Sequence, residues 1–266
     1  MRPTCLGSSA TRSHKPSKTI AVSKSHIALV RSLQRKKERD RLSLFVAEGS
    51  KTIAELLPHF GCQALFRTPD CGELTADNVV EVSRDELERL SLLQTPHDSL
   101  AILFKRPQQT VSFDDLVLAL DGVQDPGNVG TIIRIADWYG IRHIVCGPDT
   151  ADCYNPKTVQ ATMGSLARVN VASVADLAAW LETLPDGLPV YGTLLDGSDI
   201  YSQELQGHGI IVMGSEGRGI SPAVRQLIAS KLKINPYPTT AKTAESLNVA
   251  IATAITIAEF RRRTTT

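Results

Sequence analysis

The sequence predicts an α/β protein with a parallel β-sheet, and three observations carry that prediction. Short apolar, β-prone runs alternate with helix-forming segments along most of the 266 residues, as expected for strands joined by crossover helices. Several of these runs, such as Leu100–Phe104 and Gly209–Met213, are continuously apolar, which is typical of strands covered on both faces. Hydrophobic residues make up 42% and charged residues 21% of the chain, an ordinary globular composition that excludes a wholly disordered or collagen-like protein.

The cysteines and the hydropathy exclude further classes. The five cysteines form no C-x-x-C pair and no Cys/His cluster, so we expect no metal site and no disulfide framework. A reducing compartment fits this pattern, and we expect a cytoplasmic protein. No stretch of 18 uncharged apolar residues occurs, so we expect no membrane span.

The front of the chain is basic. Residues 1–113 contain 17 Lys and Arg against 12 Asp and Glu, whereas residues 114–266 contain 12 against 16. Such asymmetry favours a polyanionic partner such as nucleic acid, although a charged tail and a solvated helix face would also produce it. Residues 1–22 are rich in Ser, Thr, Lys and Arg and are predicted to be a disordered basic tail, with a transit peptide or an RNA-binding arm left open.

Residues 23–106 are predicted to form a small α/β domain. A helix is expected over 25–41, and it carries six basic residues from Arg31 to Arg41. Ser83, with Glu86 three residues later, has the form of a capping box at the start of a later helix. Strands are expected over 44–48, 64–67, 78–82 and 100–104, and a helix over 50–58. The polar, proline-containing stretch 107–113 is the expected linker.

Residues 114–266 alternate in the same way and are predicted to form a second domain. Strands are expected over 116–120, 141–145, 190–194, 209–213 and 232–234. Helices are expected over 130–139, 156–166, 174–184, 222–230 and 244–262. Ligands of such sheets bind where loops leave the carboxyl ends of the strands, so the loops after these strands are the candidates for a site.

The first candidate loop covers residues 121–134, between an apolar strand and a helix. A glycine-rich loop in this position can hold a phosphate with free backbone N–H groups. Gly122 and Gly127 have P-loop spacing, but Asn128 stands where the motif requires lysine, and no G-x-G-x-x-G occurs here. Walker A and dinucleotide motifs are therefore both excluded. What remains is the amide of Asn128 and the guanidinium of Arg134, unless the loop is simply a tight turn with a surface arginine.

The second candidate loop follows the strand over 209–213 and contains Gly214, Gly217 and Gly219, with Glu216 between them. Glycines at this spacing let the backbone approach a ligand or let another chain segment pass closely. Glu216 is either a general base or an acceptor of N–H bonds that shapes the loop.

The third candidate loop begins at Ile234, is rich in Pro and Thr, and leads into the last helix. Ser246, Leu247 and Asn248 are expected in the first turn of that helix, and small residues follow them. Small residues allow close helix packing, so a buried helix without a ligand would show the same pattern.

Together and in this order, the three loops resemble the motifs of SpoU-type (TrmH-like) RNA 2′-O-ribose methyltransferases of the SPOUT superfamily. The matching patterns are D-x-x-x-D-P-x-N-x-G-x-x-x-R, then G-x-E-G-x-G, then S-L-N-V. The segment from Asn155 to Ser165 is similar to the family's stretch between the first two motifs. Residues 24–104 are similar, more loosely, to the ribosomal-protein-like RNA-binding domain that many members carry.

This resemblance implies a parallel sheet whose C-terminal segment forms a trefoil knot, a homodimer with sites near its interface, and S-adenosyl-L-methionine as cofactor. It implies methyl transfer to a ribose 2′-hydroxyl, with ribosomal RNA favoured over transfer RNA. The implied cofactor contacts fall on Thr193, Gly214, Ile234 and Leu247. Asn235 departs from the Ile-Pro usual in the family, which leaves the contacts of the loop after Ile234 undefined.

The resemblance also assigns removal of the hydroxyl proton to Arg134. Because arginine, with a pKa above about 12, does not readily lose its proton, we expect Arg134 to bind the phosphate and the hydroxyl together while the phosphate or a water relays the proton. Asn128 would orient Arg134 or the ribose. Glu216, Ser246 and Asn248 would support the site.

The predicted basic helix would contact RNA phosphates without reading sequence, through Lys36, Lys37, Arg39 and Arg41. Aromatic residues are few in the first domain, so recognition of a folded RNA shape fits this domain better than base stacking. Two other functions stay open: an RNA-binding scaffold that has lost catalysis, and a small-molecule enzyme that holds a nucleotide in the glycine-rich loops.

Overall fold

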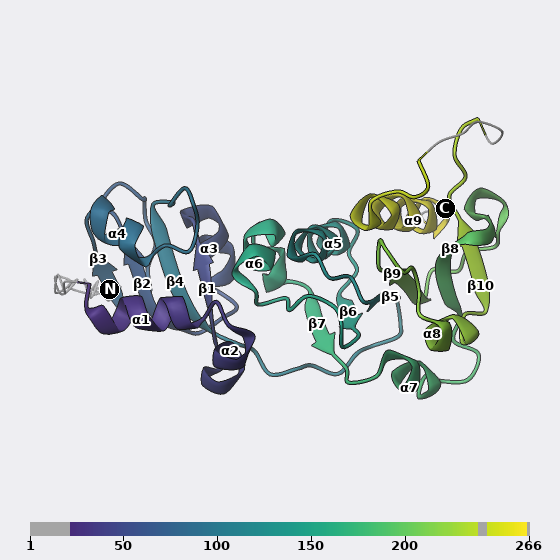
Figure 1. The fold of residues 1–266 in the computed structure, drawn as a ribbon, viewed down its shortest axis with the longest axis horizontal. Coiled ribbons are helices and arrows are strands. Elements are labelled where there is room, and N and C mark those ends of the chain that lie inside the picture. The colour runs from purple at the N-terminus through teal and green to yellow at the C-terminus, as the bar shows by residue number, and fades with distance from the viewer. Residues whose placement is uncertain (1–21, 239–243, 265–266) are drawn as a thin grey trace, which may run out of the picture.

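The computed structural model describes residues 22–238 and 244–264, which form two β-sheets in succession along the chain (Figure 1). The tail expected over residues 1–22 lies outside the described residues except for Val22. The first sheet has the strand order β1-β4-β2-β3 and is mixed, because β4 pairs antiparallel with both β1 and β2, whereas β2 and β3 are parallel. Its strands are β1 (Leu44–Glu48), β2 (Cys62–Arg67), β3 (Val79–Glu81) and β4 (Ser99–Phe104).

The basic segment of the first unit forms two helices, α1 (Lys24–Ser32) and α2 (Lys36–Leu42), so the expectation of one helix over 25–41 is wrong. The guanidinium of Arg39 donates to the backbone carbonyls of Leu33 and Gln34, both at 2.8 Å. These carbonyls lie at the end of α1, where helical carbonyls lack intrahelical partners. Arg39 thus satisfies them from the next helix, and the chain turns between α1 and α2.

Two further helices, α3 (Ser50–Leu56) and α4 (Arg84–Leu90), pack on the first sheet. The capping box expected at α4 is confirmed. The backbone N–H of Glu86 donates to the Ser83 hydroxyl at 3.3 Å, and the backbone N–H of Ser83 donates to the Glu86 carboxylate at 2.9 Å.

The second sheet is parallel throughout, as expected, with the strand order β10-β8-β9-β5-β6-β7. Its strands are β5 (Leu116–Asp121), β6 (His143–Cys146), β7 (Asn170–Ser173), β8 (Val190–Asp199), β9 (Gly209–Gly214) and β10 (Ser230–Lys233). No strand was expected at β7, because this four-residue edge strand begins with Asn and ends with Ser and lacks a continuous apolar run.

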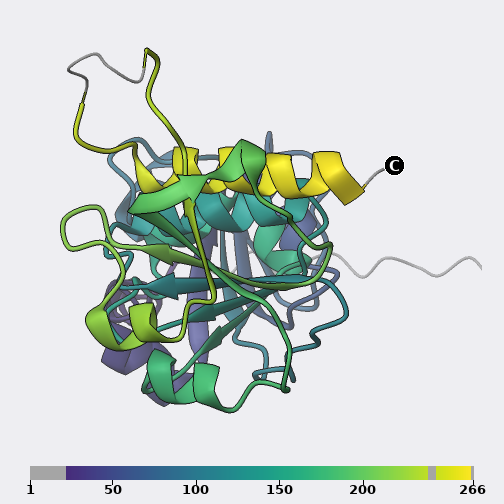
Figure 2. The same cartoon turned by 90° about the vertical axis from the view of Figure 1, so that its right-hand side faces the viewer.

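Helices cover both faces of this sheet (Figures 1 and 2). One face carries α5 (Pro126–Trp138), α6 (Pro156–Thr162) and α9 (Val249–Thr264), and the other carries α7 (Leu177–Glu182) and α8 (Pro222–Gln226). Single 3₁₀ turns follow α6 and β8, at η1 (Ser165–Ala167) and η2 (Ile200–Ser202). Separate clusters of buried apolar side chains fill the two sides of the sheet, which is the layered arrangement that the alternating pattern predicts.

The two sheet units are docked through buried and charged contacts. Arg39 of α2 is only 1% exposed, and its Nη2 donates to Asp152 of the second unit at 2.6 Å. Phe45 of β1 packs against the ring of Tyr154, with the ring centroids 4.8 Å apart. Arg39 is therefore an interface residue, and its assignment to RNA phosphates is wrong because its guanidinium is fully engaged inside the protein.

We expect Arg39→Ala to lower the stability of the protein by about 3 kcal/mol, because the substitution leaves Asp152 and two backbone carbonyls without their donor. Lys37→Ala is the matched control on the same helix, where the side chain is exposed and the change should stay within about 0.5 kcal/mol. Urea unfolding measures both. Equal midpoints for the two variants would contradict the role given to Arg39.

Candidate active site

The three candidate loops meet at one edge of the second sheet. They follow β5, β9 and β10, which belong to one parallel sheet, so their carboxyl ends lie along the same edge. Crevices at this edge bind ligands in open α/β sheets. The sheet order therefore brings together segments that are about 90 and 120 residues apart in sequence, as the contacts between residues 128, 216 and 248 show.

One polar cluster joins a residue from each loop. Asn128 donates through Nδ2 to Oε1 of Glu216 at 2.9 Å. Asn248 donates through Nδ2 to the same oxygen at 2.7 Å and to Oδ1 of Asn128 at 3.0 Å. The backbone N–H of Val249 also points to Oε1 of Glu216, at 3.3 Å. Glu216 is thus an acceptor that shapes the site, one of the two roles that the sequence analysis left open for it.

Local structure places each member of this cluster. Asp125 caps α5 by accepting from the backbone N–H of Asn128 at 2.8 Å, and Pro126 begins the helix, which therefore starts four residues earlier than expected. Asn248 caps α9, because its Oδ1 accepts from the backbone N–H groups of Ala250 and Ile251, as N-cap asparagines do. Residues 246–248 thus precede α9, and their expected place in its first turn is wrong.

Gly214 explains why the second loop needs a glycine. A Cβ at this position would lie 2.3 Å from the carbonyl carbon of Gly219, because the loop folds back and Ser215 pairs with Gly219. Asp121, at the end of β5, accepts from the backbone N–H of Ser221 at 2.6 Å. These contacts hold the loop that carries Glu216 against the end of β5.

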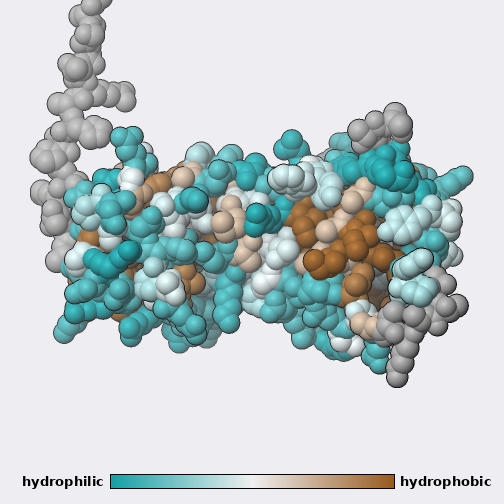
Figure 3. All heavy atoms as spheres, turned by 90° about the horizontal axis from the view of Figure 1, so that it is seen from above, coloured by the Kyte–Doolittle hydropathy of each residue, from teal (hydrophilic) through white to brown (hydrophobic). Residues whose placement is uncertain are grey.

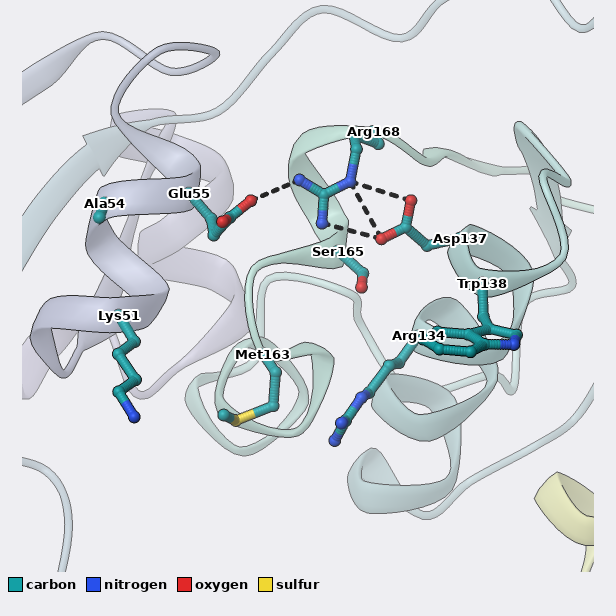
Figure 4. Close-up of a pocket in the computed structure, with 9 residues that line it drawn as sticks. All are labelled: Lys51, Ala54, Glu55, Arg134, Asp137, Trp138, Met163, Ser165 and Arg168. Atoms are coloured by element: carbon teal, nitrogen blue, oxygen red, sulfur yellow. Dashed lines mark hydrogen bonds and ion pairs between the residues drawn. The ribbon is translucent and has the colours of Figure 1, made fainter.

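Arg134 lies apart from this cluster. It is six residues beyond Asn128 on α5, which places it about 9 Å along the helix and about 120° around it. Its side chain is exposed and lines a cavity of about 600 Å³ between the two sheet units (Figure 4). Ser246 is exposed and makes no hydrogen bond to a described residue. The structure therefore unites three of the five residues predicted to be catalytic or supporting.

The wall of this cavity contains an ion-pair network that was not predicted from the sequence. Arg168 donates to Asp137 through Nε and Nη2, at 3.0 and 2.8 Å, and pairs with Glu55 of α3 (Figure 4). Burial raises the pKa of Asp137, but the hydrogen bonds from Arg168 outweigh burial and hold that pKa below its ordinary value. No local pattern signals this network, because its members come from α3, α5 and the segment before β7.

The residues predicted to contact a cofactor surround the carboxyl edge of neighbouring strands. Thr193 is on β8, Gly214 ends β9 and Ile234 directly follows β10, and the sheet order makes these strands neighbours. Leu247 is 48% exposed and precedes Asn248 of the polar cluster. The half-buried hydroxyl of Thr193, the backbone of Gly214 and the exposed side chain of Leu247 suit a ligand that is held mainly by backbone groups and apolar contact, whereas Ile234 also packs against the core. These positions therefore fit the implied cofactor.

Comparison with known proteins places this geometry in a family. A model described as the SpoU rRNA Methylase family matches residues 115–258, more than half of the chain. The chain belongs to the SpoU rRNA methylase family. A second model, described as an MRM3-like substrate binding domain, matches residues 24–101, the part that forms α1 to α4 and the first sheet.

Several relatives are similar over nearly the whole chain. The 23S rRNA (guanosine(2553)-2′-O)-methyltransferase RlmP of Bacillus subtilis is 32% identical over 242 residues, covering 87% of this chain and 94% of that protein. The structure of a TrmH-family protein from Porphyromonas gingivalis superposes with a TM-score of 0.82 at 42% identity, over 91% of this chain and 99% of that one. An AdoMet-bound rRNA methyltransferase from Sinorhizobium meliloti superposes with a TM-score of 0.76 at 29% identity, over 90% and 95% of the two chains.

Two other expectations concern absences. Among the described residues, no three His, Cys, Asp or Glu side chains are grouped so that they could hold a metal ion. In the same part of the chain, no helix has the length and apolar character needed to cross a membrane. The expectation that this SpoU-family chain works without a metal stays a prediction.

We expect Glu216→Ala to loosen the start of α9, because Asn128, Asn248 and the Val249 N–H lose their common acceptor. Amide hydrogen exchange at Val249 to Ile251 should accelerate about tenfold or more, in line with the loss of hydrogen bonds to a charged group. Glu216→Gln keeps an oxygen at the accepting position and should retain most of the protection. Glu204→Ala, at an exposed acid elsewhere, is the control. An unchanged exchange rate at these amides in Glu216→Ala would contradict the role of Glu216 as their common acceptor.

Proposed function

We propose that this protein transfers a methyl group from S-adenosyl-L-methionine to a ribose 2′-hydroxyl of ribosomal RNA. The observation that carries the proposal is the hydrogen-bonded cluster of Asn128, Glu216 and Asn248 at the carboxyl edge of the parallel sheet, in a chain of the SpoU rRNA methylase family. Relatives named as rRNA methyltransferases cover nearly the whole chain, which favours ribosomal over transfer RNA as substrate.

The cofactor, when bound, supplies an electrophilic methyl group on a sulfonium sulfur. Thr193, Gly214, Ile234 and Leu247 would hold it at the edge of the sheet. The chain then has to position the ribose and help its hydroxyl lose a proton, and positioning is where most of the rate gain in such displacements arises. The polar cluster keeps the loops around this position in one arrangement.

Arg134 would bind the RNA rather than act as a base. Its guanidinium is exposed and makes no hydrogen bond or ion pair with a described residue, so it is available to a phosphate and to the ribose hydroxyl together. Among the described residues, no histidine hydrogen-bonds to Asn128, Glu216 or Asn248, so the proton would pass to the phosphate or to a water.

The first sheet unit would bind RNA through the exposed face of α2. Lys37 is exposed, Lys36 pairs with Asp40, and Arg41 pairs with Glu38. Exposed pairs of this kind contribute little to stability, so Lys36 and Arg41 can exchange their partners for phosphates. The match of residues 24–101 to a substrate-binding model supports this role.

A homodimer and a C-terminal knot are part of the proposal. Figure 3 shows apolar side chains gathered on the face where Figure 1 places α9, and Ile251 of that helix is 52% exposed. A second copy of the chain would cover this face. Membership of the SpoU rRNA methylase family supports the knot. A cytoplasmic location stays a prediction.

We expect purified protein to transfer radiolabel from S-adenosyl-L-methionine to unmodified total RNA, with the label in the large ribosomal fraction after size separation. Label in the small fraction would move the substrate to transfer RNA.

Arg134→Ala should abolish turnover while equilibrium dialysis still detects cofactor binding. Equal loss of both would contradict the role given to Arg134. A wild-type protein that binds RNA but neither binds cofactor nor transfers label would be a scaffold.

A further inference from the structure

The cavity between the two sheet units has an electrostatic character of its own. Both of its acidic residues, Glu55 and Asp137, are paired with Arg168 (Figure 4). Two cations remain, Lys51 on α3 and Arg134 on α5. Both are exposed and make no hydrogen bond or ion pair with a described residue, and Figure 4 shows their side chains extending toward the same side of the cavity. The charges of the cavity that have no partner among the described residues are therefore positive, and a phosphate would neutralise them.

The same cavity presents a bare aromatic surface. Trp138 is 85% exposed, and its indole makes no ring or cation–π contact among the described residues. It follows Arg134 by four positions on α5, so the two side chains lie on one face of the helix. Exposed aromatic rings beside basic residues are the surfaces on which single-stranded bases stack.

The turn after α6 completes the cavity and packs closely against α3. Met163 is 46% exposed and has a left-handed backbone, with φ of 51°, a conformation that few residues other than glycine adopt. Gly164, at φ of 91°, lies so near α3 that a Cβ there would be 2.5 Å from Cβ of Glu55. The Met163 side chain lines the cavity and lies between Lys51 and Arg134 in the view of Figure 4.

We propose that this cavity holds one nucleotide of the substrate RNA, adjacent to the methylated one, with its base stacked on Trp138 and its phosphate between Lys51 and Arg134. The volume of about 600 Å³ is in the range of small-ligand sites. This inference rests on the proposed function, in which Arg134 meets the target ribose. It adds Lys51 and Trp138 as residues that position the RNA.

RNA suits this cavity better than a second copy of the chain. A protein partner that covered Trp138 would also bury the charges of Lys51 and Arg134, and buried charges without partners are costly. A phosphate neutralises them, and the base supplies a flat surface for the indole. The apolar face of α9, in contrast, has the character expected of an interface between protein chains.

Tryptophan fluorescence tests the stacking directly. The chain has two tryptophans, so Trp180→Phe leaves Trp138 as the reporter. A short single-stranded RNA oligomer should quench its emission, whereas an abasic oligomer of the same length, with the same phosphates, should not. Equal effects of the two oligomers would overturn the stacking. Emission that changes with protein concentration in the absence of RNA would mean that a second copy covers Trp138, which would also overturn the proposal.

Steady-state methyl transfer tests the effect on substrate. We expect Trp138→Ala to raise KM for RNA about tenfold with little change in kcat at saturating RNA or in cofactor affinity, and Trp138→Phe to recover most of the loss. Lys51→Gln should also raise KM and lower the salt slope of RNA binding by about one. Tyr201→Ala and Lys231→Gln, at an exposed aromatic and an exposed lysine elsewhere, are the controls.

The two proposals fail separately. Unchanged KM in both Trp138→Ala and Lys51→Gln, with an active wild-type enzyme, overturns the nucleotide site and leaves the methyl transfer standing. A wild-type protein without methyl transfer overturns the proposed function, and base-dependent quenching of Trp138 would then still support the nucleotide site.

Discussion

A single carboxylate oxygen organises the candidate active site. Oε1 of Glu216 accepts hydrogen bonds from Asn128, Asn248 and the backbone of Val249, so one acceptor ties together three loops from distant parts of the chain. Because Asn248 also caps α9, the position of that helix depends on the same contact. A hydrogen bond to a charged group is stronger than one between neutral groups, which suits a hub at an exposed edge of the sheet.

The position of Glu216 depends in turn on glycine. Gly214 lets the loop after β9 fold back against Gly219, where a Cβ would collide with backbone. Asp121 holds the far side of this loop through the backbone N–H of Ser221. Backbone contacts therefore shape most of this edge of the sheet. Side chains add hydrogen bonds at only a few positions, such as Asp121 and Glu216.

A second set of charges holds the two sheet units together and borders the cavity between them. Arg39 and Arg168 use their guanidinium groups on Asp152, Asp137 and Glu55, so these cations serve the fold. Lys51 and Arg134 lie within the same region and have no such partner among the described residues. Their different surroundings separate cations that hold the fold from cations that are available to a ligand, although all four are basic residues in the sequence. The helix α5 links the two regions, because it carries Arg134 at the cavity and Asn128 at the polar cluster.

The sequence by itself determined the parallel second sheet, the capping box at Ser83 and the place of the three candidate loops after strands of that sheet. These follow from local patterns, because apolar runs define strands and the carboxyl ends of parallel strands share one edge. Only the tertiary structure decided that Arg39 is buried and that the basic segment breaks after α1. It also decided that Glu216 joins Asn128 and Asn248, and that Arg134 lines a cavity with Lys51 and Trp138, apart from this cluster. Asp152, the partner of Arg39, is 113 residues away, and the cavity exists only because α3 docks against α5 and the turn after α6. Local spacing along the chain predicts helices, strands and the loops that follow them. The docking of the two units depends on the shape and charge of surfaces built from distant segments, which local spacing does not predict.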